Sequence, residues 1–299
     1  MALRSNFPDE LTADQLPALE AHLFDAYEEH PDLVPKIYNV HTSKRWGEQT
    51  TTVAGLPAVP TKPEGTAYTF ADPLQGYDRT YTHTEYGLAV SFSQTLIEDD
   101  QFGLVKDTYR STGKAVYQTR QVQAADFLNS GFGDTGPDGV SLFNTAHVMI
   151  DLATQANRPT SEVTTSVAGL REMETNQRNQ VNHRSINVMI IPRQICIPPI
   201  LYHQTMELVK SVDRPDTANR SMNTFYNENY DIVVSPFFTS TTAWCVLADK
   251  GVHELRWYDR VLPSTDSWVD KKTGDVNTSV RMRFSSGYSD FLGSWGTSG

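Results

Sequence analysis

The chain has 299 residues, of which 38% are hydrophobic and 20% are charged, and its formal net charge is −11. This length allows one large domain or two domains of ordinary size, and the hydrophobic fraction is sufficient for a real core. The acidic balance excludes the basic surface of a specific nucleic-acid-binding protein, and the absence of a leader and of an apolar run of about 18 residues excludes a membrane span.

The first predicted element is a helix within residues 12–32, TADQLPALEAHLFDAYEEHPD. Pro17 disturbs its first turns and Pro31 ends it. An isolated helix with one apolar face needs a neighbour to cover that face, so two interpretations stay open: the helix docks on its own domain, or it reaches as an arm over another copy of the chain. The apolar stripe consists of Leu16, Leu19, Leu23, Phe24 and Tyr27.

Residues 43–82 are rich in Thr, Gly and Pro and contain two short alternating pieces, QTTTV and TAYTF. About 40 residues of this kind are too many for a loop inside a compact domain. They predict a long two-stranded projection instead. Because an isolated hairpin is barely stable in water, this projection implies a partner surface and is the first indication of assembly.

Residues 81–97 alternate well and predict a strand that leads into a helix. Residues 98–129 predict a helix of about 30 residues and about 45 Å, which opens with three acids that suit a helix N-terminus. Gly113 lies inside it and weakens the expectation of a straight rod. One face carries Phe102, Val105, Tyr109, Val116 and Phe127, whereas Arg110, Lys114, Arg120 and Gln121 fall elsewhere.

A glycine-rich stretch, 131–139, follows the long helix and contains a literal G-x-G-x-x-G. A dinucleotide site needs a strand before this motif and a helix start after it, and neither is present, so we expect a turn that reverses the chain. The next elements, taken in order, predict an α/β block followed by a strand-rich end. They are a helix at 167–180, a buried strand at 186–199, a helix at 200–211, an irregular loop at 212–230, and the strands DIVVSPFF, AWCVLAD, GVHELRWY and SVRMRFSSGYSD.

Few residues are candidates for catalysis or metal binding. Asn144, Thr145 and His147 stand together in DGVSLFNTAHVMI, and either an active site or a structural clasp would use such a row. His83 and Glu85 at i, i+2 on a predicted strand would share a face as metal ligands or as an acid–base pair. No H-E-x-x-H, C-x-x-C, G-x-S-x-G or P-loop motif occurs.

The remaining candidates have ordinary explanations. Asp134 and Asp138 lack the further ligand positions of an EF-hand calcium loop. Cys196 and Cys245 lie in apolar strand-like runs and are expected to be buried thiols. The sequence therefore predicts no catalytic, cofactor-binding or metal-binding residues and no enzyme activity.

The order of these elements resembles the major capsid proteins of tailed bacteriophages with the HK97-type fold, and it looks closest to the Mu-like major head subunit group. The most specific pieces are GVSLFNTAH (139–147), LYHQTMELVKS (201–211) and NENYDIVVSPFF…AWCVLAD (227–249). The resemblance implies an α+β capsid fold with an N-terminal arm, an extended loop, a spine helix, and peripheral and axial domains. It also implies a structural protein that forms the pentamers and hexamers of an icosahedral shell around double-stranded DNA in the virion.

The resemblance places each segment. Residues 1–42 would be the N-terminal arm, 43–82 the extended loop, and 83–139 the peripheral domain with the spine helix at 98–129. Residues 140–235 would form the axial domain, and 236–299 would supply C-terminal strands to both domains. Asn144, Thr145 and His147 would then hold the start of the axial domain by satisfying backbone groups.

The partners implied by the resemblance are copies of the chain, a separate scaffolding protein, a portal and a decoration protein, with packaged DNA contacted non-specifically and without any cofactor or membrane. The N-terminal segment is too short for a scaffolding region of its own. Lys62 is a conceivable donor for an inter-subunit cross-link, but nothing identifies its partners. Three alternatives stay open: a nanocompartment shell that packages an enzyme, another virion part such as a tail or baseplate protein, and a hydrolase or metal-dependent enzyme that uses His83, Glu85 or His147.

Overall fold

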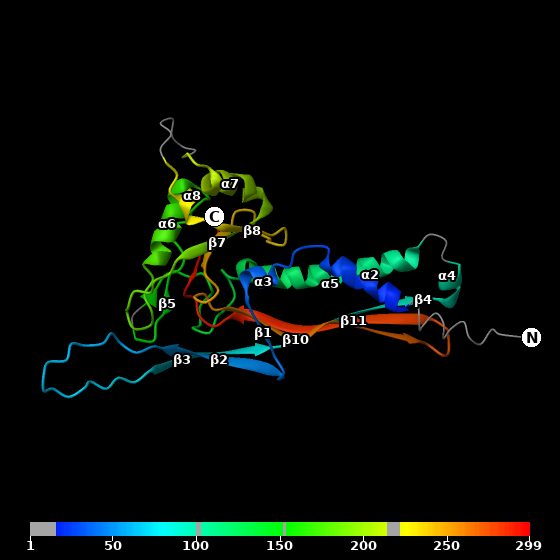
Figure 1. Ribbon diagram of the computed structural model, residues 1–299, viewed down its shortest axis with the longest axis horizontal. Coiled ribbons are helices and arrows are strands. Elements are labelled where there is room, and N and C mark those ends of the chain that lie inside the picture. The colour runs from blue at the N-terminus through cyan, green and yellow to red at the C-terminus, as the bar shows by residue number, and fades with distance from the viewer. Residues whose placement is uncertain (1–15, 100–102, 152–153, 214–221) are drawn as a thin grey trace, which may run out of the picture.

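The computed structural model describes residues 16–99, 103–151, 154–213 and 222–299. The molecule is elongated (Figure 1): a long sheet has helices along one face, a smaller domain stands at one end of that sheet, and a hairpin extends from beneath the same end. The order of elements is mixed α and β, as the sequence predicts.

The long sheet has the strand order β1-β10-β11-β4. Its strands are β1 (Asn39–Thr42), β10 (Leu255–Val269), β11 (Val276–Tyr288) and β4 (Thr84–Phe92). The β1–β10 pair is parallel and the other two pairs are antiparallel. Alternate residues of β11 are buried, from Val276 to Phe284, because one face of the strand packs against the helices. Strand β10 continues past Pro263, further than the sequence analysis expects.

Two helices, α2 (Leu16–Glu28) and α5 (Leu104–Asn129), run along one face of this sheet (Figure 1). In α5 the expected apolar residues Val105, Tyr109 and Val116 are buried, as is Phe127; Phe102 lies outside the described residues. The helix does not begin at residue 98 as expected. Gly103, in the left-handed conformation with a φ of 70°, precedes it, and a separate short helix, α4 (Gln94–Glu98), lies upstream.

The helix α2 docks on its own chain. A Cβ atom added at Gly113 of α5 would lie 2.2 Å from the carbonyl oxygen of Leu23, so the glycine permits a very close approach of the two helices. Leu23 and Ala26 are buried. For residues 16–28 the structure therefore shows the first of the two interpretations, in which the helix covers its face against its own domain.

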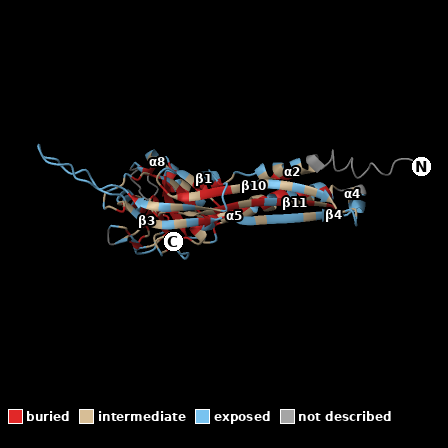
Figure 2. Ribbon diagram, turned by 90° about the horizontal axis from the view of Figure 1, so that it is seen from below, coloured by how far each residue is buried: buried red, intermediate tan, exposed pale blue. Residues whose placement is uncertain are grey.

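The expected two-stranded projection is confirmed as the antiparallel pair β2 (Gly47–Ala54) and β3 (Leu74–Thr82). Its base is held against the end of β11 by Ser289, whose hydroxyl lies 2.7 Å from the Tyr81 hydroxyl and 2.8 Å from that of Thr50. The connection between the strands, residues 55–73, is exposed throughout. Figure 2 shows this connection leaving the body of the molecule in the exposed colour.

The smaller domain is built on a second sheet with the order β12-β9-β7-β8. Its strands are β7 (Pro192–Ile197), β8 (Asp231–Val234), β9 (Trp244–Ala248) and β12 (Ser294–Thr297). The expected helices appear as α6 (Val167–Arg178) and α7 (Tyr202–Lys210). The strand expected from residue 186 begins only at Pro192, since Asn187 forms a bridge with Val181 and redirects the preceding segment.

The remaining elements are short: α3 (Val34–Ile37), β5 (His147–Val148), β6 (Thr154–Gln155), the 3-10 helix η2 (Pro199–Leu201) and α8 (Phe225–Glu228).

The helices and strands enclose two hydrophobic cores. One lies between the long sheet and its helices and continues under the smaller domain, where it includes Leu142, Phe143, Cys196 and Cys245. The other lies inside the smaller domain around Trp244, Met173 and Trp295. No helix of the described residues is long and apolar enough to cross a bilayer.

Candidate assembly surfaces and internal polar clusters

Asn144 and His147 belong to a buried polar clasp at the start of the smaller domain. The Nδ1 atom of His147 lies 2.5 Å from Asp138 Oδ2, and its Nε2 atom lies 2.9 Å from Asn157 Oδ1. The imidazole ring also stacks on Phe291, with 3.9 Å between ring centroids. His147 is completely buried. Each polar atom of the ring is therefore committed to a partner within the fold.

Asn157 links this clasp to the backbone. Its Oδ1 atom accepts a hydrogen bond from the backbone N–H of Asn144 at 2.8 Å, and its Nδ2 atom donates to the carbonyl of Leu142 at 2.7 Å. Asn144 Oδ1 in turn accepts from the N–H of Ala146 at 3.0 Å. The expected role of satisfying backbone groups holds for Asn144, whereas Thr145 is exposed. Asn144, His147 and Asn157 thus hold one another and the nearby backbone, as the side chains of a structural clasp do.

Asp138 is the carboxylate that the sequence analysis did not connect with His147. It lies nine positions earlier in the chain, on the far side of the turn that follows α5. Of the two Asp residues considered for a calcium site, Asp138 is thus engaged by His147. Among the described residues, no cluster of three or more His, Cys, Asp or Glu side chains is placed to hold a metal ion.

His83 and Glu85 do not share a face, which corrects the expectation for this pair. His83 lies between β3 and β4, where its ring is buried and contacts the hydroxyls of Ser43 (2.9 Å) and Ser285 (3.0 Å). Burial and the charge of Arg283 lower the pKa of His83. Glu85 instead accepts from Arg281 Nε at 2.7 Å on the exposed face of the sheet. The two side chains cannot act together as an acid–base pair.

A second buried cluster ties two distant segments to α5. The guanidinium of Arg120 donates to both carboxylate oxygens of Asp259 on β10, at 2.8 and 3.1 Å, and to Asp32 at 3.2 Å. Gln121 donates to Asp32 at 2.8 Å and accepts from the N–H of Leu33 at 2.9 Å. Burial alone would lower the pKa of Arg120, but the hydrogen bond and charge of Asp259 outweigh it and raise this pKa.

Two further polar contacts involve the smaller domain: one joins it to the hairpin, and the other joins it to the segment after β11. The hydroxyl of Tyr77 on β3 donates to the carbonyl of Val148 at 3.1 Å. His183 lies 3.2 Å from Asp290 and accepts from the N–H of Ile150 at 3.4 Å through its other ring nitrogen. The Tyr77 contact, together with those of Ser289, fixes the base of the hairpin against both domains, while the connection at its far end is exposed.

The connection between β2 and β3 carries some of the most exposed apolar side chains among the described residues. In the 55–73 connection Val59 and Phe70 are each 95% exposed, and Tyr68 is 77% exposed. Lys62 lies 4.4 Å above the Tyr68 ring, which is a contact within the same loop. So many exposed apolar side chains on one thin extension are typical of a surface that another molecule covers.

The two cysteines lie opposite each other on the paired strands β7 and β9, and both are free and fully buried. Burial, followed by the neighbouring Cys196 thiol, raises the pKa of Cys245. The expectation of buried thiols is confirmed.

Comparison with known proteins agrees with this architecture. The model of a family described as phage capsid protein matches residues 76–295. No curated protein matches the sequence.

Several solved structures share the fold. The procapsid of bacteriophage JBD30 is 15% identical, with a TM-score of 0.53, and the match covers 96% of this chain and 75% of that one. A virus-like particle from Pyrococcus furiosus is 9% identical, with a TM-score of 0.59 and coverage of 95% and 100%. A structure of Mycobacterium phage Adephagia is 11% identical, with a TM-score of 0.55 and coverage of 90% of each chain.

Proposed function

The chain belongs to the phage capsid protein family, and from that premise we propose that it is a major head subunit that assembles into the pentamers and hexamers of an icosahedral shell around double-stranded DNA. Its role is structural and its place is the virion. Assembly of the shell takes place in the cytoplasm of the host bacterium.

The observation that carries this proposal is the exposed 55–73 connection. In the part of the chain that the structure describes, its apolar side chains are largely exposed, although the base of the hairpin is firmly held. A shell that contains DNA under pressure is stabilised by many contacts repeated by symmetry. An extension that crosses a subunit boundary distributes such contacts well, and permanent interfaces of this kind commonly bury about 2,000 Å² or more.

The division of the chain follows from the two sheets. We propose that the long sheet with α2 and α5 is the peripheral domain and that the smaller domain is the axial one. The strands after residue 236 support this division, because β10 and β11 lie in the long sheet while β9 and β12 lie in the other. Because β1 at 39–42 is part of the long sheet and α2 packs on α5, we assign residues 16–42 of the expected arm to the peripheral domain.

Partners beyond the chain itself are a scaffolding protein, a portal and a decoration protein. The JBD30 capsid, which shares the fold, is described as decorated with minor capsid protein trimers. Packaged DNA would be contacted only weakly, since a chain with a net charge of −11 repels phosphates on average. A strong, salt-dependent affinity of the purified subunit for duplex DNA would contradict this part of the proposal.

We also propose that the chain falls within the Mu-like major head subunit group. The support is the order of the segments 139–147, 201–211 and 227–249 in the sequence. A profile of Mu-like head subunits that aligns all three segments would agree with this grouping, and a better alignment to another capsid group would contradict it.

Electron microscopy of the expressed chain, with and without its neighbouring gene products, tests the main proposal. We expect closed shells that contain DNA in the complete system. Shells that contain an enzyme instead would identify a nanocompartment, and rings or tubes would identify another virion part. A chain that stays monomeric with all neighbouring products present would refute the proposal.

A deletion tests the role of the hairpin separately. Replacing residues 57–72 with two glycines leaves β2, β3 and the Ser289 contacts in place, so we expect a subunit with unchanged thermal stability that no longer forms shells. Normal shells from this variant would show that the extension is dispensable.

A further inference from the structure

The neck of the hairpin, where β2 and β3 stop pairing, is closed by a side chain of the smaller domain. The last paired residues are Ala54 and Leu74. Just beyond them, the Nε atom of Arg184 donates to the carbonyl of Gly55 at 3.2 Å, and its Nη2 atom donates to the carbonyl of Asp72 at 2.8 Å. One guanidinium therefore bridges the two sides of the neck.

The remaining nitrogen of Arg184 binds a carboxylate of its own domain. Nη1 donates to Asp151 Oδ2 at 3.1 Å, and the Arg184 side chain is only 15% exposed. Nε and Nη2 form one edge of the planar guanidinium, so their N–H groups point in the same direction and suit two neighbouring carbonyls. A lysine at this position would keep the charge beside Asp151 but could not bridge the neck.

A tight turn, residues 182–186, presents Arg184 to the neck. The Oδ1 atom of Asn182 accepts hydrogen bonds from the backbone N–H groups of Arg184 at 2.9 Å and Ile186 at 3.0 Å. Ser185 has a φ of 60°, one of two positive φ values at non-glycine positions in the part of the chain that the structure describes. A left-handed serine is strained, and such residues persist where the surrounding structure holds them. The turn is therefore held in a specific shape that aims Arg184.

The Arg184 bridge lies at the outer limit of the hairpin's attachment. Nearer the base, a Cβ atom added at Gly76 of β3 would lie 2.3 Å from Cδ1 of Ile150, so the strand passes very close to the smaller domain. Within the described residues, no other hydrogen bond or ion pair joins the 55–73 connection to the smaller domain or the long sheet. Figure 1 shows the connection continuing outward past the smaller domain. Its starting direction is thus set at Arg184.

We propose that Arg184 is a positioning residue, which fixes the direction in which the 55–73 connection leaves the subunit and thereby speeds assembly. This inference rests on the proposed assembly function and adds the residue that prepares the extension for it. Without the bridge, the connection would sample many directions, and this freedom would be lost when another molecule covers it. Fixing the direction in the free subunit removes part of that entropic cost before subunits meet.

Three variants separate the bridge from a general effect of losing an arginine. Arg184→Met removes all three contacts, and Arg184→Lys removes the bridge but keeps the charge. Arg193→Met is the matched control, because Arg193 lies in the same domain and its ion pair with Asp249, at 3.6 Å, does not involve the hairpin. Gly55 and Asp72 are exposed, so water can hydrate their carbonyls in the variants, and we expect all three chains to fold.

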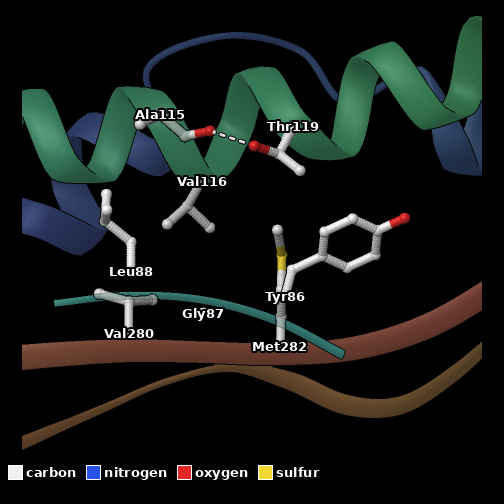
Figure 3. Close-up of a pocket in the computed structure, with 8 residues that line it drawn as sticks. All are labelled: Tyr86, Gly87, Leu88, Ala115, Val116, Thr119, Val280 and Met282. Atoms are coloured by element: carbon white, nitrogen blue, oxygen red, sulfur yellow. Dashed lines mark hydrogen bonds between the residues drawn. The ribbon is translucent and has the colours of Figure 1, made fainter. Parts of the chain in front are cut away.

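The two domains offer fixed reference points for distance measurements. Figure 3 shows Leu88 of β4 and Val280 of β11 on one side of a small groove and Val116 of α5 on the other. Because β4 also pairs with β11 along its length, a spin label at the exposed Thr84 reports the position of the long sheet. A label at Ile200, which is 69% exposed, reports the smaller domain.

Spin-label distances in the free subunit test the positioning role. Both native cysteines are buried, so labels attach to cysteines introduced in pairs among Val59, Thr84 and Ile200. We expect the distributions from Val59 to both references to be about twofold broader in Arg184→Met and nearly as broad in Arg184→Lys, with no change in Arg193→Met. The distribution between Thr84 and Ile200 should stay the same in every chain.

Two results would overturn the positioning role. Unchanged Val59 distributions in Arg184→Met would show that the bridge does not fix the connection. A broader distribution between Thr84 and Ile200 would show that the substitution loosens the whole subunit instead of the neck alone.

Assembly of the unlabelled chains, followed by light scattering, tests the consequence. We expect Arg184→Met and Arg184→Lys to form shells about tenfold more slowly than the parent chain, and Arg193→Met to match the parent. Broader label distributions with an unchanged assembly rate would overturn the proposal, because the fixed direction would then have no effect on assembly. If the parent chain forms no shells, the proposed function fails, whereas the label distances still decide whether Arg184 fixes the connection.

Discussion

Arg120 of α5 and Asp259 of β10 form a two-pronged ion pair inside the long-sheet core, with donor–acceptor distances of 2.8 and 3.1 Å. The indole N–H of Trp257 donates to the same carboxylate at 2.8 Å, and the guanidinium lies 4.9 Å from the Trp257 ring. Asp259 stands where the pairing of β10 with β11 first shifts register. The pair therefore fastens the long helix to the sheet at the point where β10 departs from a regular strand.

Replacing Arg120 with methionine should lower the free energy of unfolding by about 3–5 kcal/mol, because the carboxylate of Asp259 would remain buried without its counter-ion. The loss of unfolding free energy in Arg120→Lys should be smaller than in Arg120→Met but still measurable, since an ammonium keeps the charge but cannot reproduce the two parallel hydrogen bonds. Arg281→Met, which breaks the exposed pair with Glu85, is the matched control and should cost less than about 1 kcal/mol. Urea unfolding measures all three, and an effect of Arg120→Met no larger than that of the control would contradict the assignment.

The long helix, the hairpin and most strands were predictable because each depends on a local pattern. The apolar spacing along α5 and the alternation in TEYGLAVSF and VRMRF are visible in a single stretch of sequence. Arg120 and Gln121 fall off the apolar face of α5 by that spacing, yet both are buried. Arg120 is paired with Asp259, 139 residues away in the chain, and Gln121 with Asp32, 89 residues away, and no local pattern contains such partners.

The sequence did not identify the partner of His147 for a similar reason, because the pairing depends on tertiary packing. Asp138 is near in sequence, but the turn that brings the two side chains together is set by the packing of the chain after α5. Strand β10 extends beyond the predicted GVHELRWY segment because register shifts after Asp259 and Val261 accommodate Pro263 in the sheet.

His147→Leu should destabilise the fold by about 3 kcal/mol or more, since it leaves the buried Asp138 carboxylate without its partner. In the Asp138→Asn background the same substitution should cost less, and a double-mutant cycle should give a coupling above about 1 kcal/mol. Thr145→Ala, at the exposed neighbouring position, should change stability by less than about 0.5 kcal/mol. Additive effects of the two clasp substitutions would show that the pair contributes nothing beyond its separate parts.

Gly113→Ala should destabilise the chain, although alanine is the better helix former by about 1 kcal/mol. The new methyl group would meet the carbonyl oxygen of Leu23 at 2.2 Å, a backbone atom that cannot move without shifting α2. Overpacking of this kind costs about 1–3 kcal/mol. Ser111→Ala on the exposed side of the same helix provides the comparison and should be neutral or slightly stabilising. Proteolysis of the Gly113→Ala variant should also release α2 earlier than in the parent chain, and a stabilised variant would rule out the close helix contact.

His253 makes stability depend on pH in the mildly acidic range. The ring is buried, accepts a hydrogen bond from the N–H of Leu255 at 3.4 Å, and has no partner for Nε2 among the described residues. Burial, together with the charge of Lys250, lowers the pKa of His253 to about 4. In the unfolded chain the pKa is about 6.5, so the unfolded state binds the proton first as the pH falls.

The contribution of His253 to stability is therefore complete above about pH 6.5 and is lost progressively down to about pH 4, with a total of about 3 kcal/mol at the pKa shift given above. We expect His253→Asn, whose amide oxygen can accept the Leu255 N–H, to flatten the fall in unfolding free energy between these two pH values. Urea unfolding at pH 7.5, 6, 5 and 4 for both chains measures the difference. Asparagine cannot take up a proton, so His253→Asn removes the proton uptake of residue 253 on unfolding. If the unfolding free energies of the two chains fall in parallel as the pH is lowered, His253 is not the group that titrates.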